Sequence, residues 1–424
     1  MRRTAANWLE LAERVWHYRR DVITASESAE LARLREGLKQ LLKANADAAR
    51  LKLGIESLEA SLRKCGGAIY PKTAVTENVE FFLVAAIVIL GIRTYFVQPF
   101  KIPTNSMWPT YYGMTAENLP PGSAAPGPLE RVFRFAAFGA ERKEAVAPHD
   151  GRVSLAFFNR YQVAYTLYKT RTWLIIPTKV KQYTFYVDGD SVAVRVPQDF
   201  GDSEFRSLVI STFFGSAAAF DAYWEGMQRS GELAQDKVIR FDEGSEDFRR
   251  VVELPLPGNA RAGQPILRFD LLTGDQLFVD RVSYNFVRPK VGQGFVFRTG
   301  NIPGIGLDEY YIKRLVGQPG DLLEVRSPVL YRNGVPISGA EAFRLNAERV
   351  APYGGYTYGN TLYDARFLFK GETLTVPPGG FFAMGDNSAN SSDGRVWGFV
   401  PEKDVVGRPL CIYYPFTRRW GPAR

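Results

Sequence analysis

Residues 311–321 read YIKRLVGQPGD. Apolar and β-branched residues surround a lysine in the first half, and Pro-Gly follows, so the stretch predicts a β-strand that ends in a tight turn. In a strand, side chains alternate between two faces, and Lys313 therefore shares a face with Tyr311 and Leu315. An inward-facing Lys313 would be desolvated, whereas an outward-facing one would be an ordinary surface lysine. The stretch alone leaves both orientations open.

A composition typical of β-strands continues over the chain from residue 101 onward. Short runs rich in aromatic and β-branched residues are separated by Gly, Pro, Asp and Asn. They include Thr184–Val187, Ser191–Val196, Gln276–Val282, Gly294–Arg298, Leu322–Val325 and Phe381–Met384. One amphipathic stretch, Ala217–Ser230, predicts a helix. We therefore expect a mainly β domain over residues 101–424.

The most apolar stretch lies before this region. Residues 81–92 read FFLVAAIVILGI and carry no charge. Extended to Val79–Phe100, the segment has 22 residues, enough for about 33 Å of helix and thus for a bilayer core of about 30 Å. Arg93 is close enough to one end to extend toward the interface. The sequence predicts one transmembrane helix over 79–100, with a buried helix of a soluble domain as the alternative.

The apolar residues in 1–64 are spaced as in helices. Apolar residues recur three and four positions apart before a break near Asn45 and again after it. The first stripe consists of Leu31, Leu34, Leu38 and Leu41. Both a short coiled coil and a helical hairpin packed on itself fit this pattern, so self-association through residues 1–64 stays open.

The net charge of +8 is unevenly distributed, because residues 1–72 hold 14 Lys and Arg against 9 Asp and Glu. A basic arm beside an apolar segment is typical of the cytoplasmic flank of a membrane protein. Nucleic acid is not an expected partner, since no basic run exceeds two residues.

Histidine and cysteine are scarce. The chain has only His17, His149, Cys65 and Cys411, and their scatter fits neither a zinc site nor a disulfide framework. We expect no metal and no cofactor. Acid–base chemistry would then fall to a lysine, which can activate a serine once its pKa is lowered.

Two serines of the chain are candidates for the nucleophile in such chemistry, Ser106 and Ser61. Residues 102–110 read IPTNSMWPT, where two prolines bracket a turn that would present Ser106. The S-x-x-K pattern from Ser61 to Lys64 lies on a charged helix and lacks the companion motifs of penicillin-binding enzymes. We therefore take Ser106 and Lys313 as the candidate pair.

Four blocks together resemble bacterial type I signal peptidases (leader peptidases), a family of membrane-bound Ser/Lys proteases. In chain order they are residues 102–110, 274–284, 311–321 and 384–401, the last reading MGDNSANSSDGRVWGFVP. They cover only about 50 of the 424 residues. The resemblance implies a signal-peptidase-like β fold for the catalytic domain, with a helical or coiled-coil arm and one transmembrane helix before it.

The resemblance also implies roles for individual residues. Ser106 would be the nucleophile and Lys313 its general base. Thr104 and the Ser106 backbone N–H would form the oxyanion hole. The supporting residues would be Ser391, which orients the lysine, the salt-bridged pair Asp393 and Arg395, and the structural residues Arg314, Asp386 and Asn387.

The chain departs from the family pattern in two ways. Asn105 stands where the family often has Gly, and we expect it to preserve the turn because Asn tolerates unusual backbone angles. About 160 residues separate the first two blocks, which predicts an inserted subdomain at about 112–270. A smaller insertion is predicted at about 328–370.

These observations lead to one functional hypothesis. The chain would be a serine endopeptidase of the cytoplasmic (inner) membrane that cleaves signal peptides from exported preproteins through an acyl-enzyme. Residues 1–72 would be cytoplasmic and residues 101–424 extracytoplasmic or periplasmic, with preproteins and the lipid bilayer as partners. The alternatives are an inactive membrane-anchored scaffold and a self-processing regulatory Ser/Lys protease.

Overall fold

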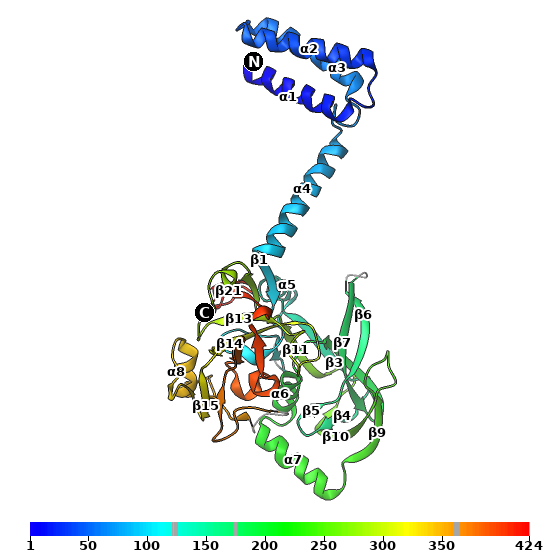
Figure 1. Cartoon of the computed structure of the whole chain (residues 1–424). Coiled ribbons are helices and arrows are strands. Elements are labelled where there is room, and N and C mark those ends of the chain that lie inside the picture. Colours follow the sequence, from blue (N-terminus) through cyan, green and yellow to red (C-terminus); the bar gives the residue numbers. More distant parts are fainter. Residues whose placement is uncertain (121, 123–125, 173–175, 360–364, 424) are drawn as a thin grey trace. The chain divides into compact units, whose positions relative to one another are not determined.

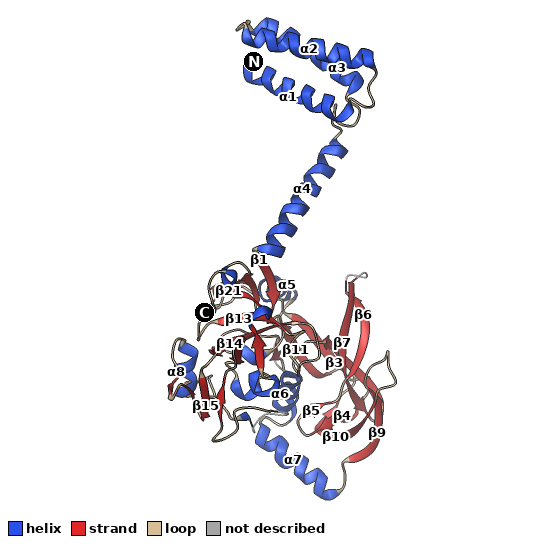
Figure 2. Cartoon of the chain, in the orientation of Figure 1, coloured by secondary structure: helices blue, strands red, loops and turns tan. Residues whose placement is uncertain are grey.

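The computed structural model describes residues 1–120, 122, 126–172, 176–359 and 365–423 (Figure 1). The chain divides into two compact units, Met1–Ile92 and Arg93–Arg424. Helices make up the first unit, and strands predominate in the second (Figure 2).

The first unit contains a bundle of α1 (Arg2–Arg19), α2 (Ala25–Lys43) and α3 (Ala48–Cys65). Thr24 begins α2 with a capping box to Glu27, and the Asp47 carboxylate caps α3, so each start satisfies backbone N–H groups that lack a helical partner. Their apolar faces form one core inside the chain. Its buried members are Ala5, Ala12, Val15, Leu31, Leu38, Leu51, Ile55, Leu58, Leu62 and Cys65. The leucine stripe thus packs within the chain, as in the helical-hairpin alternative, with α1 as a third helix.

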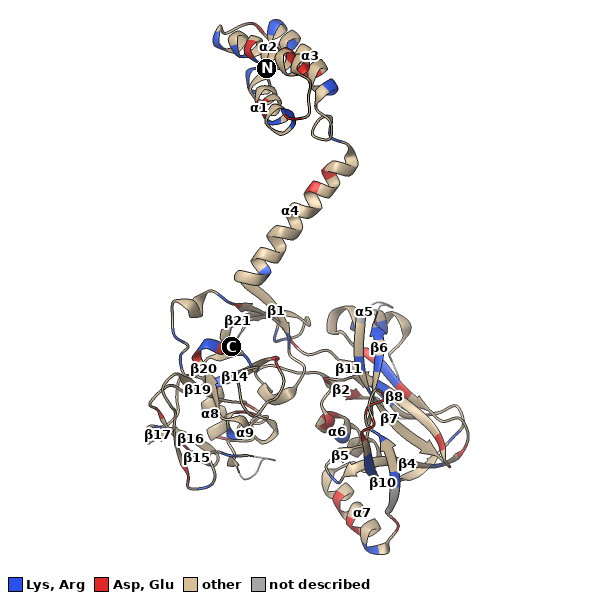
Figure 3. Ribbon diagram, turned by 45° about the vertical axis from the view of Figure 1, so that its right-hand side comes forward, with Lys and Arg blue, Asp and Glu red and all other residues tan. Residues whose placement is uncertain are grey.

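The apolar helix α4 (Ala74–Tyr95) has 22 residues, a mean hydropathy of 2.0 over its most apolar window, and no buried residue. Its charged residues lie near its ends (Figure 3). By length and composition α4 can cross a membrane.

The expected boundaries of this helix were wrong. The helix covers 74–95 rather than 79–100, and Val97–Lys101 form the strand β1, which pairs with β12 (Gln276–Asp280). Pro99 explains the change, because proline disrupts a helix interior but is tolerated at the edge of a sheet, where β1 lies.

Among the described residues, an eight-stranded sheet carries the candidate site. Its order is β1-β12-β21-β13-β14-β19-β20, and β22 pairs with β21. The other members are β13 (Gly294–Arg298), β14 (Tyr310–Gly317), β19 (Gly380–Met384), β20 (Phe399–Pro401), β21 (Val405–Tyr414) and β22 (Gly421–Pro422). The first strand after α4 is therefore paired with a strand that lies some 180 positions later in the chain.

The segment between β1 and β12 has a core of its own. Its buried apolar residues run from Met114 to Leu271, while the inserted subdomain expected at about 112–270 stays a prediction. A seven-stranded sheet contains β4 (Gly151–Asn159), β5 (Gln162–Val163), β6 (Thr166–Thr172), β7 (Ile176–Val187), β8 (Asp190–Pro197), β9 (Ala234–Arg240) and β10 (Phe248–Ala260). A three-stranded sheet contains β2 (Thr115–Asn118), β3 (Glu141–Val146) and β11 (Pro265–Leu272), and the helices are α5 (Pro128–Phe138), α6 (Asp202–Phe213) and α7 (Ala217–Ser230). We call residues 112–270 the intervening subdomain.

A small four-stranded sheet lies after β14. It contains β15 (Leu322–Arg326), β16 (Val329–Arg332), β17 (Val335–Pro336) and β18 (Thr373–Thr375), and α8 (Glu341–Ala347) follows β17. The smaller predicted insertion, about 328–370, includes β16, β17 and α8, although residues 360–364 lie outside the described residues. The remaining short helices are η1 (Asn105–Met107), η2 (Ser283–Asn285), η4 (Ser388–Asn390), η5 (Glu402–Asp404) and α9 (Gly394–Trp397).

Candidate active site

Ser106 lies in the single 3₁₀ turn η1, which follows β1. Two backbone bonds hold this turn: the Ile102 N–H donates to the Asp275 carbonyl at 2.9 Å, and the Asn387 N–H donates to the Ser106 carbonyl at 3.1 Å. Met107, the last residue of the turn, is fully buried. The turn is thus fixed both to the sheet and to the segment that follows β19.

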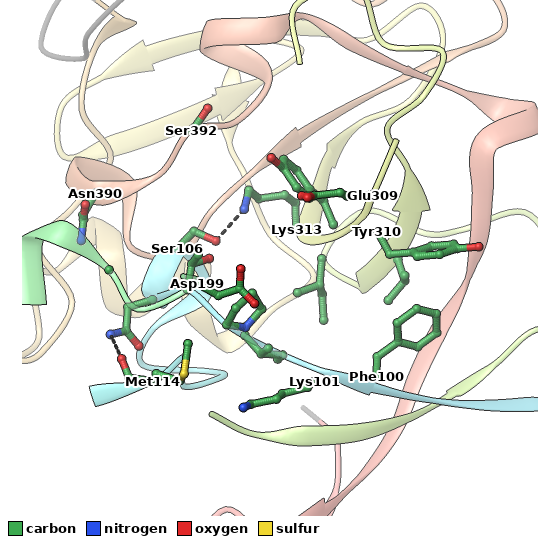
Figure 4. Close-up of a pocket in the computed structure, with 18 of the residues that line it drawn as sticks. Phe100, Lys101, Ser106, Met114, Asp199, Glu309, Tyr310, Lys313, Asn390 and Ser392 are labelled. Atoms are coloured by element: carbon green, nitrogen blue, oxygen red, sulfur yellow. Dashed lines mark hydrogen bonds between the residues drawn. The ribbon is translucent and has the colours of Figure 1, made fainter. Parts of the chain in front are cut away.

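Lys313 lies in β14 with its Nζ 2.5 Å from the Ser106 Oγ (Figure 4). Its side chain is buried because both faces of β14 are covered: Leu315 joins one apolar cluster and Ile312 packs against another. Of the two orientations that the sequence left open, the inward one is present.

Burial lowers the pKa of Lys313 from 10.5 to about 8, although the charges of Asp393 and Asp386 act in the opposite direction. Desolvation disfavours the ammonium form of a buried lysine. A substantial neutral fraction is therefore available near pH 8, and only the neutral amine can accept a proton from a serine hydroxyl.

Arg314, the next residue in β14, forms a buried ion pair with Asp386. Its Nε and Nη2 lie 2.6 and 2.5 Å from the two carboxylate oxygens, and the Thr110 hydroxyl donates to the same carboxylate at 2.5 Å. This pair joins β14 to the segment after β19 and, through Thr110, to the residues that follow η1, which we call the nucleophile turn because it contains Ser106.

Asp393 and Arg395 form a second ion pair with both side chains fully buried. The Arg395 Nε and Nη2 donate to the Asp393 carboxylate at 2.9 and 2.7 Å. Burial alone would raise the pKa of Asp393, but the charge and hydrogen bonds of Arg395 hold it below its ordinary value. The carboxylate also accepts the Gly385 N–H at 3.0 Å.

The other predicted site residues lie around this centre. Thr104 lines the same cleft as Ser106 and Lys313. Ser391 is buried, and within the described part of the chain its hydroxyl has no hydrogen-bond partner, so its role in orienting the lysine stays a prediction. A methyl group at Gly385 would lie 2.2 Å from this hydroxyl and 2.3 Å from the Ser106 carbonyl. Glycine at position 385 therefore permits the close packing of these two serines.

The Ser/Lys pair opens into a cleft of about 370 Å³. Apolar side chains from β1, β12, β13 and β14 line much of it, among them Phe100, Leu277, Val296 and Ile312. Such a mixture of an apolar wall and a few polar groups is typical of a binding cleft.

Sequence reasoning missed one wall of this cleft. Asp199, Gly201, Ser203 and Glu204 come from the intervening subdomain and line the cleft with the Ser/Lys pair; Asp199 and Ser106 are both labelled in Figure 4. No local pattern marks these residues, because they reach the cleft through the tertiary fold.

Asn105 also differs from expectation. It lies in the 3₁₀ backbone of η1 and not at a positive φ, so tolerance of unusual angles does not explain it. Its side chain instead accepts the Gly113 N–H at 2.8 Å and donates to Glu204 at 2.7 Å.

His149, in the intervening subdomain, forms a hydrogen bond with Asp190 at 3.1 Å and does not line the cleft that contains Ser106 and Lys313. Among the residues that the structure describes, no group of three or more His, Cys, Asp or Glu could hold a metal ion.

Known proteins resemble the second unit. The family model described as "Signal peptidase, peptidase S26" matches residues 267–414, a range that includes Lys313 and the block at 384–401 but not Ser106. A "Probable signal peptidase I-1" of Synechocystis sp. is 33% identical over 151 residues, which cover 35% of this chain and 66% of that protein. The chain therefore spans just under two thirds of that relative.

Two further relatives differ in what their names state. A "Signal peptidase I" of Bacillus caldolyticus is 32% identical over 154 residues, covering 35% of this chain and 74% of that protein. An "Inactive signal peptidase IA" of Staphylococcus aureus is 25% identical over 145 residues, covering 34% of this chain and 72% of that protein. Similarity alone therefore does not establish activity, which depends on the site residues.

Proposed function

Because the chain belongs to the signal peptidase family, peptidase S26, we propose that it is a membrane-anchored serine endopeptidase that removes N-terminal signal peptides from exported preproteins. The observation that carries this proposal is the 2.5 Å approach of the Lys313 Nζ to the Ser106 Oγ in a buried site. A scaffold without activity would not need a desolvated lysine at a serine hydroxyl, since burial of a lysine amine destabilises the fold.

In the acylation step, Ser106 attacks the scissile carbonyl while neutral Lys313 accepts the hydroxyl proton. The C–N bond of the substrate breaks as the lysine ammonium gives this proton to the leaving amine. The signal peptide stays esterified to Ser106, and the mature protein leaves with a free amino terminus.

In the deacylation step, Lys313 accepts a proton from a water molecule, which attacks the ester carbonyl. The ester bond to the Ser106 oxygen breaks, and the proton returns to that oxygen. The signal peptide leaves with a free carboxylate, and the pair returns to its starting state.

The oxyanion would be stabilised by the Thr104 hydroxyl and the Ser106 backbone N–H. Donors already in place for the developing negative charge lower the barrier because they need no reorganisation. The position of Thr104 at the cleft, two residues before Ser106, supports this role.

The proposal places α4 in the cytoplasmic membrane, with residues 1–72 in the cytoplasm and the catalytic domain outside. The excess of basic residues in 1–72 supports this orientation. In right-side-out vesicles, an added protease should digest residues 101–424 and leave the α1–α3 bundle intact. Protection of the catalytic domain would contradict the orientation without affecting the chemistry.

The direct test incubates the detergent-solubilised full chain with a model preprotein. Wild type should release a mature protein whose new amino terminus is found by sequencing, and Ser106→Ala should release none while melting at the same temperature. Equal cleavage by both would refute the assignment of Ser106. An absence of cleavage by wild type would favour the scaffold, and cleavage of the chain itself but not of the preprotein would favour a self-processing protease.

A further inference from the structure

Helix α6 of the intervening subdomain reaches the nucleophile turn. Glu204, in its first turn, accepts a hydrogen bond from the Asn105 Nδ2 at 2.7 Å. Phe205 and Val209 anchor the helix, since both are fully buried in the core of the subdomain. The carboxylate is therefore presented to Asn105 from a rigid support.

The Asn105 amide is held on both sides. Its Oδ1 accepts the Gly113 N–H at 2.8 Å, and its Nδ2 donates to the Met114 carbonyl at 3.3 Å as well as to Glu204. These partners fix which end of the amide is oxygen and which is nitrogen, and they use both hydrogens of the nitrogen. The bond to Glu204 is the shortest of the three, and it lowers the pKa of the Glu204 carboxyl, which burial raises above its usual value.

The main chain of Asn105 is joined directly to the backbone N–H of Ser106. The Asn105 carbonyl and the Ser106 N–H belong to one rigid peptide plane, on which they point in opposite directions. Asn387 Nδ2 and the Trp108 N–H both donate to this carbonyl, each at 3.1 Å. The direction of the Asn105 carbonyl therefore sets the direction in which the Ser106 N–H points.

We propose that Glu204 is a positioning residue: through the Asn105 side chain it fixes the peptide plane that aims the Ser106 N–H at the developing oxyanion. The intervening subdomain would thus act on catalysis in addition to forming one wall of the cleft. This inference rests on the proposed function, because it assumes an acyl-transfer reaction at Ser106. It also gives a reason for Asn at position 105, since glycine has no side chain that could bond to Glu204.

The first test compares kcat and KM for cleavage of a model preprotein by full-length variants in detergent. Glu204→Ala should lower kcat about ten-fold and leave KM unchanged, because the oxyanion forms only in the transition state. Glu204→Gln keeps an acceptor oxygen for Asn105 and should stay within about three-fold of wild type. Ser207→Ala, on an exposed position of the same helix, is the matched control and should match wild type in both constants.

The second test is a double-mutant cycle, which separates action through Asn105 from a general effect of α6. If Glu204 acts through Asn105, the double variant Asn105→Ala/Glu204→Ala should be no slower than Asn105→Ala alone. Melting temperatures identify any variant that fails to fold. If Asn105→Ala fails to fold, the comparison of Glu204→Gln with Glu204→Ala still tests the proposal.

Different outcomes overturn different claims. Unchanged kcat in Glu204→Ala, fully additive losses in the cycle, or a rise in KM alone would overturn the positioning role while cleavage by wild type upholds the proposed function. If wild type does not cleave the preprotein, the proposed function fails, and this inference fails with it.

Discussion

The Lys313 Nζ lies 2.5 Å from the Ser106 Oγ although 207 positions separate the two residues. Three strands stand between β1 and β14 in the sheet, so four interstrand spacings would hold the two strands about 19 Å apart if the sheet were flat. The turn after Lys101, rather than direct strand pairing, brings Ser106 to the lysine. The bonds that hold this turn are therefore as important to the site as the two reacting groups.

Replacement of Lys313 by methionine should stabilise the fold in a pH-dependent way. The pKa of this lysine is about 8 in the folded chain against 10.5 for an ordinary lysine. Between these values the unfolded state binds more protons, so the free energy of unfolding of wild type rises with pH. At pH 7, Lys313→Met should gain about 3 kcal/mol relative to wild type, and this gain should shrink as the pH approaches 10.5.

Chemical denaturation in detergent at several pH values measures this difference. Lys370→Met, at an exposed position, is the matched control and should show no such pH dependence. A gain for Lys313→Met that stays constant from pH 7 to 10 would mean that the lysine is not neutralised by burial.

The pH dependence of kcat/KM should report the same group. Lys313 must be neutral to accept the Ser106 proton, so the rate should fall as the pH drops below about 8. An initial-rate series from pH 5 to 10 with one preprotein measures this limb. Full activity at pH 5, where Lys313 is protonated, would require another base.

Much of the fold could be predicted from local patterns. Ala217–Ser230 is helical at the predicted residues, because its apolar spacing and the Ser216 cap are local signals. The stretch at 311–321 is a strand followed by a turn, as its composition indicates. Pro99 was a local signal that the apolar helix ends before it, but the pairing of β1 with β12 depends on residues some 180 positions away and could not be foreseen.

The candidate site was predictable only in part. The motifs gave Ser106 and Lys313, but the inward orientation of Lys313 depends on apolar clusters built from several strands. The contact of Glu204 with Asn105 could not be foreseen, since it joins two regions 99 positions apart. The departure from Gly at position 105 was a signal, but Asn105 has no positive φ and instead forms side-chain hydrogen bonds to Gly113 and Glu204.

Thr104 should act through its hydroxyl alone. Thr104→Ser retains the hydroxyl and should keep kcat within a few-fold, whereas Thr104→Ala should lower kcat about 10²-fold, the usual effect of removing one oxyanion donor. KM should change little in either variant. Steady-state kinetics measure kcat and KM of the two variants, and equal kcat values would exclude the Thr104 hydroxyl from the oxyanion hole.

The buried Asp393–Arg395 pair should contribute far more to stability than an exposed ion pair. Arg395→Met would leave the Asp393 carboxylate unpaired in the interior, which should cost about 3–5 kcal/mol of unfolding free energy. The matched control is Arg344→Met, whose partner Glu348 lies at the surface with about half of its side chain exposed, and the expected loss is under about 1 kcal/mol. Denaturation of both variants at pH 7 measures the contrast. Similar small losses would mean that water reaches Asp393, and its charge could then no longer act on the pKa of Lys313 through a dry interior.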